Sequence, residues 1–187
     1  LTNKINKQRT KRKRKTEESS AFQSVFDKFT YETIEKLRKK GFIAEFIGIL
    51  SAGKAANVYF GKDNNENPVA IKIYKIDPHN TRWMKNYIIG DPRFHKIGTS
   101  THKIIYTWCK KEFKNLKRLE KNGIKAPKPL GLMKNVLVME FIGEKNGTPA
   151  PRLKDVANLQ NPLKEFEIII SLIEKIVTKA KLIHGDL

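Results

Sequence analysis

Val69-Ala70-Ile71-Lys72-Ile73-Tyr74 is a run of strand-forming residues with one lysine in its middle. It follows a polar turn at residues 63–68, so it reads as a short strand within a sheet. Alternation along a strand places Lys72 on the same face as Ala70 and Tyr74. An ammonium group on such a strand is costly unless it has a partner, so the sequence predicts a partner for Lys72.

A helix between Thr101 and Asn122, ended by Gly123, offers a candidate partner. Its apolar stripe recurs at helical spacing and contains a single charge, Glu112; the stripe is Ile105, Trp108, Glu112, Leu116 and Leu119. A lone glutamate at the edge of a stripe usually reaches water. The alternative is an inward carboxylate bonded to Lys72, and we favour it because an unpaired carboxylate on that face would destabilise the core.

The last residues, Leu182-Ile183-His184-Gly185-Asp186-Leu187, follow an apolar helix expected at residues 161–180. By itself this pattern is that of a helix closed by glycine. Together with Lys72 and Glu112 it indicates the start of a kinase catalytic loop, in which the aspartate accepts the proton of the attacking hydroxyl. The metal-binding Asn and Asp of such loops would lie beyond Leu187, so we expect the 187-residue chain itself to be inactive.

Gly48-Ile49-Leu50-Ser51-Ala52-Gly53-Lys54-Ala55 nearly fits the Walker phosphate-binding pattern. Ala55 lacks the hydroxyl that this pattern requires, and residues 56–61 read as a strand instead of a helix. The stretch therefore predicts a lid of two strands and a turn, whose backbone N–H groups and Ser51 hydroxyl cover phosphates.

Five motifs in this order resemble the RIO family of atypical protein kinases, type-one branch, in an archaeal style. They are Ser51–Tyr59, Ala70–Lys75, Gly90–Phe94, Met139–Gly143 and His184–Leu187. One departure is Ala55, where the family usually carries an acidic residue.

The resemblance implies an α+β, protein-kinase-like bilobal fold. Its small lobe has five antiparallel strands and one main helix, and its helical large lobe is incomplete here. The expected organisation is a disordered basic tail (1–20), an N-terminal helical extension (21–41), a small lobe with hinge (42–143) and the start of the large lobe (144–187).

The resemblance also implies roles for individual residues. Asp186 is the catalytic base, Lys72 binds phosphate and Glu112 orients Lys72. Met139 lies at the back of the adenine site, the main chain of Glu140 and Ile142 bonds the adenine, and Pro149 lies near the mouth. The remaining nucleotide-binding residues are Ser51, Gly53, Lys54, Asn57, Val58 and Ala70. ATP with magnesium or manganese is expected, and no metal ligand is assigned within this chain.

The implied activity is that of a non-specific serine/threonine protein kinase or ATPase in the cytoplasm. Its implied partner is ribosomal RNA or the pre-ribosomal small subunit, during maturation of that subunit, and the protein substrate is not predicted. Two alternatives are a small-molecule kinase of the aminoglycoside or choline type and a non-catalytic RNA-binding assembly factor.

Composition agrees with a phosphate-rich partner. The net charge is +19, residues 4–15 hold eight Lys or Arg and no acid, and residues 41–187 carry 25 basic against 14 acidic side chains.

The single Cys109 excludes an internal disulfide and suits a buried thiol. No stretch has the roughly 20 apolar residues of a membrane span, and no secretory signal is present. Three histidines, His79, His95 and His102, lack the spacing of a metal site.

The remaining elements are read from periodicity. We expect a helix at 30–40, strands at 42–50, 56–61, 129–134 and 136–140, and a hinge at 141–150. Residues 76–100 read as a long irregular segment that mixes cations with aromatic residues. It would either close over the nucleotide or touch RNA by stacking, or dock on the surface with its aromatic residues in a minor cluster.

Overall fold

The computed structural model of the chain describes residues 26–94 and 98–185. The elements in chain order are α2 (Lys28–Lys39), β1 (Glu45–Ala52), β2 (Ala56–Lys62), β3 (Pro68–Tyr74), α3 (Pro78–Ile88), α4 (Thr101–Lys121), β4 (Pro129–Met133), β5 (Val136–Glu140), the 3-10 turn η1 (Leu153–Asp155) and α5 (Pro162–Thr178). Three predictions lie outside the described residues: the basic tail, His95 and Asp186.

The strands form one antiparallel sheet in the order β1-β2-β3-β5-β4, which confirms the predicted five-stranded small lobe. β1 begins at Glu45, three residues later than expected. The reason is that Ile43 is fully buried in the core beneath α2, so the chain enters the sheet only after this anchor.

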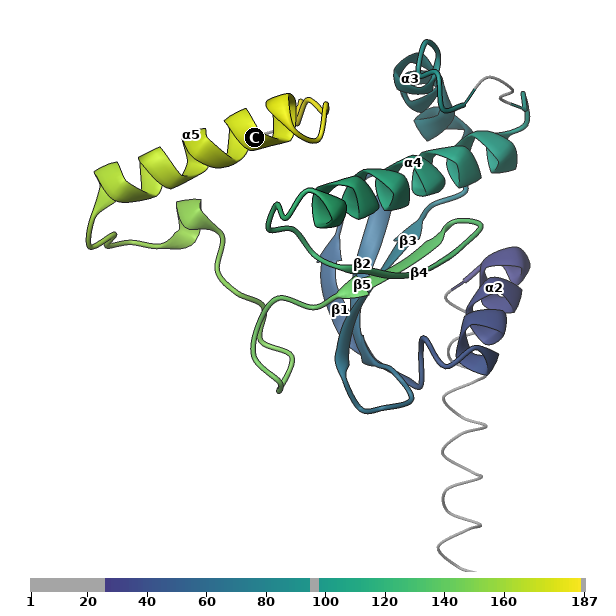
Figure 1. Cartoon of the computed structure of the whole chain (residues 1–187). Coiled ribbons are helices and arrows are strands. Elements are labelled where there is room, and N and C mark those ends of the chain that lie inside the picture. The colour runs from purple at the N-terminus through teal and green to yellow at the C-terminus, as the bar shows by residue number, and fades with distance from the viewer. Residues whose placement is uncertain (1–25, 95–97, 186–187) are drawn as a thin grey trace, which may run out of the picture.

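Helices cover both faces of the sheet (Figure 1). Ile34 and Leu37 of α2 pack on the face that carries Val69 and Ile71. On the opposite face, Ile105 and Cys109 of α4 pack against Tyr74 and Leu137. Residues 69–74 therefore alternate between the two faces as the sequence predicts.

A buried asparagine joins α2 to the sheet. Asn135, in the turn between β4 and β5, is fully buried, and its Nδ2 donates to Thr30 Oγ1 at 2.9 Å and to the Tyr74 carbonyl at 3.0 Å. Asp27 caps the same helix by accepting from the Thr30 N–H at 3.0 Å. Since Thr30 takes part in both contacts, the N-terminal extension is fixed to the end of β3.

The prediction of an irregular segment at residues 76–100 is wrong for its first half, which forms α3. Asp77 caps this helix and Pro78 occupies its first turn, a combination that favours a helix start. Met84 and Ile88, one turn apart, are fully buried against α4. The apolar face of α3 is short and is flanked by polar residues, so its period is hard to recognise in the sequence.

Helix α5 was predicted at residues 161–180 and is found at nearly the same place, with Asn161 as its N-cap. Figure 1 shows it set apart from the sheet. None of its residues is buried, and Leu163 and Phe166 are 77% and 61% exposed. The apolar side chains of α5 therefore lie open to solvent in the described structure. No helix in the described part of the chain has the length and apolar character needed to cross a membrane.

Candidate active site

Two neighbouring rows of side chains cross the face of the sheet that α4 partly covers. Directly opposed residues of paired strands point to the same side, so the rows follow from the strand pairing. The first row is Ser51, Val58, Lys72 and Leu137, and the second is Gly48, Phe60, Ala70 and Met139. The pairing therefore places five of the predicted site residues on one surface: Ser51, Val58, Ala70, Lys72 and Met139.

Lys72 and Glu112 form the ion pair that the sequence predicts. The Lys72 ammonium lies 2.8 Å from Oε1 and 3.0 Å from Oε2 of Glu112, across 40 residues of sequence. Each side chain is 26% exposed. The ammonium also lies 5.2 Å from the centre of the Tyr74 ring, which favours a cation at this position. Glu112 thus holds the ammonium of Lys72 in one place above the central strand of the sheet.

Apolar residues line the other end of this face. Phe60, Ala70 and Phe141 form a buried cluster, with Val58 and Met139 packed against it. The Phe60 and Phe141 rings have centroids 4.7 Å apart. A flat heterocycle that contacts Val58 and Ala70 would meet a firm apolar surface here.

The segment after β5 leaves one hydrogen-bond donor beside this cluster. Residues 142–150 fold back on themselves: the Ala150 N–H donates to the Ile142 carbonyl at 3.0 Å, and Gly143 pairs with Pro149. The Ile142 carbonyl is therefore occupied, whereas its N–H has no partner among the described residues. The main chain of Ile142 and that of Glu140 were predicted to bond the adenine; the N–H of Glu140 is already used, because it donates to the Lys128 carbonyl at 2.8 Å.

The lid between β1 and β2 closes on a tight turn. The Gly53 N–H donates to the Ala56 carbonyl at 2.9 Å, and a Cβ atom at residue 53 would lie only 2.8 Å from that oxygen, so the turn requires glycine. Lys75, at the end of β3, donates from its side chain to the Gly53 carbonyl at 2.7 Å. Its backbone N–H donates to the Ala55 carbonyl at 2.9 Å. Lys75 therefore fastens the lid to the strand that carries Lys72.

Two predicted site residues, Asn57 and Lys54, do not join this group, and a third, Asp186, is not tested. Asn57 lies in the row of Ala52 and Ile73, on the α2 face, where its Nδ2 donates to the Tyr59 hydroxyl at 3.3 Å. Lys54 is exposed at the tip of the lid. Asp186 lies outside the described residues, although the preceding Gly185 has a φ of 76°, which favours glycine at that position.

The residues that hold the outer side of α4 form a network that was not predicted from the sequence. Arg93 donates to Asp91 with its Nη2 at 2.7 Å and to Asn115 Oδ1 with its Nη1 at 2.9 Å. Lys111 lies 3.2 Å from the same aspartate and precedes Glu112 in the helix. Hydrogen bonds from Arg93, and a further one from Lys111, hold the pKa of the Asp91 carboxyl far below its ordinary value of 3.8. This network pins the segment after α3 to the turn of α4 that carries Glu112. Its sequence signal is the motif Gly90–Phe94, which the resemblance had already singled out.

Comparison with known proteins now identifies the family. A family model described as the RIO domain matches residues 57–187, which include Lys72, Glu112 and the residues after β5. The chain belongs to the RIO family.

Two archaeal relatives of this RIO domain carry the name RIO-type serine/threonine-protein kinase Rio1. The protein from Haloferax volcanii is 40% identical over 165 residues, which cover 88% of this chain and 56% of the relative. The protein from Methanocaldococcus jannaschii is 41% identical over 163 residues, covering 87% of this chain and 55% of the relative. The chain thus spans about half the length of these relatives.

Solved structures support the fold. The RIO domain aligns with the Rio2 kinase from Chaetomium thermophilum in its complex with ADP, Mg²⁺ and phosphoaspartate, with a TM-score of 0.60 and 15% identity. The alignment covers 79% of this chain and 41% of that one. A second structure of the same kinase gives a TM-score of 0.61 at 17% identity. The kinase-like α+β fold predicted from the sequence is thereby confirmed.

Proposed function

We propose that this RIO domain binds ATP and belongs to a cytoplasmic serine/threonine protein kinase or ATPase that acts in maturation of the small ribosomal subunit. The observation that carries the proposal is the Lys72–Glu112 ion pair. A half-buried lysine held at 2.8 Å by a carboxylate from another element is a costly arrangement for stability alone. It is well suited to holding a cation where phosphates arrive.

In the proposed reaction, each part of the site has one task. The Ile142 N–H donates to the adenine, whose faces pack on Val58 and Ala70. Lys72 donates to the α- and β-phosphates, and Glu112 keeps its ammonium in place. The lid backbone covers the phosphates and excludes water.

Proton transfer is assigned to Asp186, which accepts the proton of the attacking serine hydroxyl. Among residues 26–94 and 98–185, no three His, Cys, Asp or Glu side chains gather as metal ligands. A magnesium or manganese ion, when bound with ATP, would neutralise the charge that develops on the phosphates. The chain's own part, in the proposal, is to fix the nucleotide, to exclude water and to accept the proton at Asp186.

Calorimetric titration with ATP tests the nucleotide site in the chain as it stands. Lys72→Ala should weaken binding by roughly 10- to 100-fold, because a hydrogen bond to a charged group contributes about 1.5–3 kcal/mol. Lys54→Ala is the matched control, since it removes the same side chain from the exposed lid tip, and it should cost less than about threefold. Equal losses for the two variants would contradict the assignment of Lys72.

The reaction is tested in the complete natural gene product, with γ-labelled ATP as phosphate donor. Phosphate should appear on serine of the protein itself or be released as inorganic phosphate, and Asp186→Ala should abolish both. If transfer survives Asp186→Ala while Lys72→Ala weakens ATP binding, the nucleotide site stands and the assignment of the base is wrong.

An RNA partner is supported by charge. The eight basic residues between Lys4 and Lys15 would release counterions from any RNA that they neutralise. Deleting residues 1–20 should therefore lower affinity for all RNA sequences and flatten the dependence of affinity on salt. An unchanged salt dependence would show that the electrostatic contacts lie elsewhere in the chain.

A further inference from the structure

Three aromatic side chains meet at the outer surface of α3 and α4. The Trp83 and Trp108 ring centroids lie 5.0 Å apart, and the Tyr87 ring lies 6.4 Å and 6.2 Å from them, all in edge-on contacts. We name these three residues the ring cluster. They are brought together by α3, which the nucleotide site described above does not use.

The ring cluster is open to solvent on one side. Trp83 is 37% and Tyr87 is 66% exposed. Neighbouring Ile89 is 58% exposed. Burial of Met84 and Ile88 already fixes α3 on α4, so the outer parts of the rings contribute little to the core. Large aromatic side chains that remain exposed together indicate a binding surface more often than isolated ones do.

The charge around the cluster is mostly positive, and the nearby carboxylate of Asp91 is paired with Arg93 and Lys111. α3 contains two basic and no acidic residues, and α4 contains seven basic and two acidic ones. Both acids are occupied, Glu112 by Lys72 and Glu120 by Lys117.

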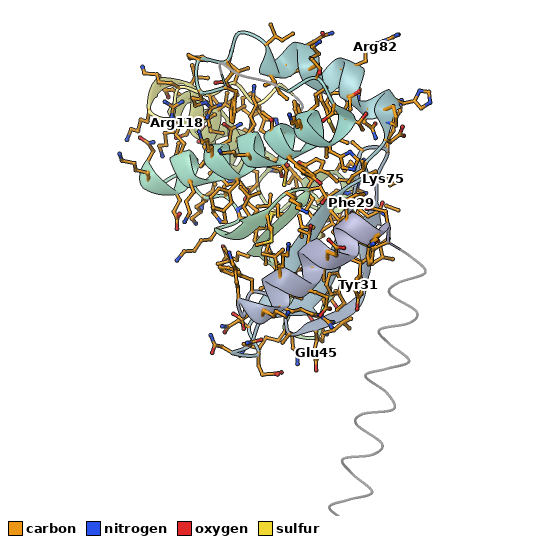
Figure 2. All side chains as sticks on the ribbon, turned by 90° about the vertical axis from the view of Figure 1, so that its right-hand side faces the viewer. Phe29, Tyr31, Glu45, Lys75, Arg82 and Arg118 are labelled. Atoms are coloured by element: carbon orange, nitrogen blue, oxygen red, sulfur yellow. The ribbon has the colours of Figure 1, made fainter. Side chains whose placement is uncertain are left out.

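Exposed cations on α3 and α4 are available for a ligand that extends beyond the rings. Arg82, Lys85 and Lys110 are exposed and form no ion pair within the described part of the chain. Figure 2 shows Arg82 extending from α3 at the outer end of the molecule. A ligand that brings negative charge and flat rings would complement both features of this surface.

We propose that the ring cluster, together with exposed cations elsewhere on α3 and α4, binds single-stranded nucleic acid, with unpaired bases stacked on Tyr87 and Trp83 and phosphates on cations that the strand meets as it passes over these two helices, Arg82 among them. Stacking on aromatic side chains combined with a basic track is how unpaired strands are held without sequence preference. A protein partner would gain less, because it would not bring the repeated negative charge and the flat bases that complement the cations and the rings. The proposal deepens the RNA part of the proposed function and rests on it, but it does not involve the nucleotide site.

The chain carries its own probe for this surface. It has two tryptophans in total, Trp83 and Trp108, and both belong to the ring cluster. A base stacked there should quench the intrinsic tryptophan fluorescence. Contacts made only by the basic tail should leave that fluorescence unchanged.

The test is a titration of the 187-residue chain with an unlabelled, mixed-sequence RNA of about 12 nucleotides, within the site sizes usual for such surfaces. Single-stranded RNA and the matching single-stranded DNA should both quench, because every base has a flat face, whereas the same RNA as a duplex should quench much less. Anisotropy of a labelled copy of the RNA measures total binding in parallel.

Variants separate stacking from charge and from folding. Tyr87→Ala should weaken the quenching titration by at least about fivefold, the lower end expected for one lost stacked base. Tyr87→Phe keeps the ring and should stay within about twofold of the wild type. The matched control is Phe29→Ala, which removes a ring that is 51% exposed on α2, away from Arg82 in Figure 2; it too should stay within about twofold.

The proposal is overturned if RNA binds by anisotropy without quenching, if the duplex quenches equally, or if Tyr87→Ala binds like the wild type. RNA binding without quenching would still support an RNA partner, but it would mean that the RNA contacts basic residues away from the ring cluster. If no RNA binds by either method, the RNA part of the proposed function fails as well. Calorimetric titration of the Tyr87→Ala variant with ATP should give the wild-type affinity. This result would show that the variant is folded and that a loss of RNA binding does not come from damage to the nucleotide site.

Discussion

Replacing Glu112 with glutamine removes one charge of the Lys72–Glu112 pair and keeps the size of the side chain. At the observed 2.8 Å, the attraction between two unit charges is about 6 kcal/mol with an effective dielectric constant of about 20. Loss of water from both groups offsets most of this. The side chains of Lys72 and Glu112 are each 26% exposed, so the pair is intermediate between a surface ion pair and a fully buried one. We therefore expect Glu112→Gln to lower the free energy of unfolding by about 1–3 kcal/mol.

Urea denaturation measures this loss. With a slope of about 2 kcal/mol per molar urea, the midpoint should fall by roughly 0.5–1.5 M without a change in slope. Glu120→Gln is the matched control on the same helix, because its partner Lys117 lies at 2.9 Å but is 47% exposed. That variant should lose less than about 0.5 kcal/mol.

A double-mutant cycle makes the reasoning refutable. In Lys72→Met with Glu112→Gln neither charge is left unpaired, so the double variant should be more stable than the sum of the two single losses predicts. Additive losses would show that the two groups are not coupled. A loss for Glu112→Gln no larger than that for Glu120→Gln would show that the pair is a surface contact and would weaken the proposed role of Glu112.

Three further predictions concern other parts of the molecule. The pKa of Asp91 is lowered in the folded state, so its contribution to stability is present above the ordinary value of 3.8 and is lost as the pH falls towards the folded pKa. Asp91→Asn should therefore cost roughly 2–3 kcal/mol at pH 7, and the difference between the urea midpoints of the two proteins should shrink steadily as the pH falls below 4. Lys75→Ala removes the 2.7 Å hydrogen bond to the Gly53 carbonyl, so amide hydrogen exchange in the lid should become about fivefold faster. Lys54→Ala is the control and should leave the exchange rate unchanged. Equal rates in the wild type and in both variants would mean that Lys75 does not restrain the lid. Burial raises the pKa of the Cys109 thiol, so a thiol reagent should label it only in denaturant, and rapid labelling of the native chain would contradict its buried position.

The sheet and the ion pair could be predicted because they depend on strong local patterns. A lysine within an apolar strand and a glutamate on an apolar helix stripe are each costly alone, and their pairing removes both costs. Four of the five strands contain β-branched or aromatic residues and are bounded by turns, whereas β4 has neither residue type and was placed by its apolar residues alone. Apolar residues at helical spacing predicted α5, and Asn161, which caps its N-terminus, can be recognised in the sequence as a helix start.

What could not be predicted depends on contacts between distant segments. α3 is stabilised by burial of Met84 and Ile88 against α4, and no local sequence pattern indicates that α4 offers a surface for this helix. The link from Lys75 to Gly53 joins residues 22 positions apart and depends on the closure of the lid. Asn57 was assigned to the nucleotide by family resemblance, but strand alternation places its side chain on the opposite face from Val58.

The pairing of the sheet also limits how this chain tolerates changes of length. β2 pairs with β3, and β3 with β5, without any shift of register, whereas β1 pairs with β2 through two irregularities, between Phe46 and Gly48 and between Ile49 and Ser51. One residue inserted into β3 before Lys72 would turn the ammonium to the α2 side, and two would restore its side but move it by about 7 Å along the strand. An insertion in the first hairpin can be absorbed by another bulge in β1, at the edge of the sheet. We therefore expect insertions and deletions among natural variants of this domain to gather in the β1–β2 hairpin and to be absent from β3 and β5, which an alignment of many such sequences would show directly.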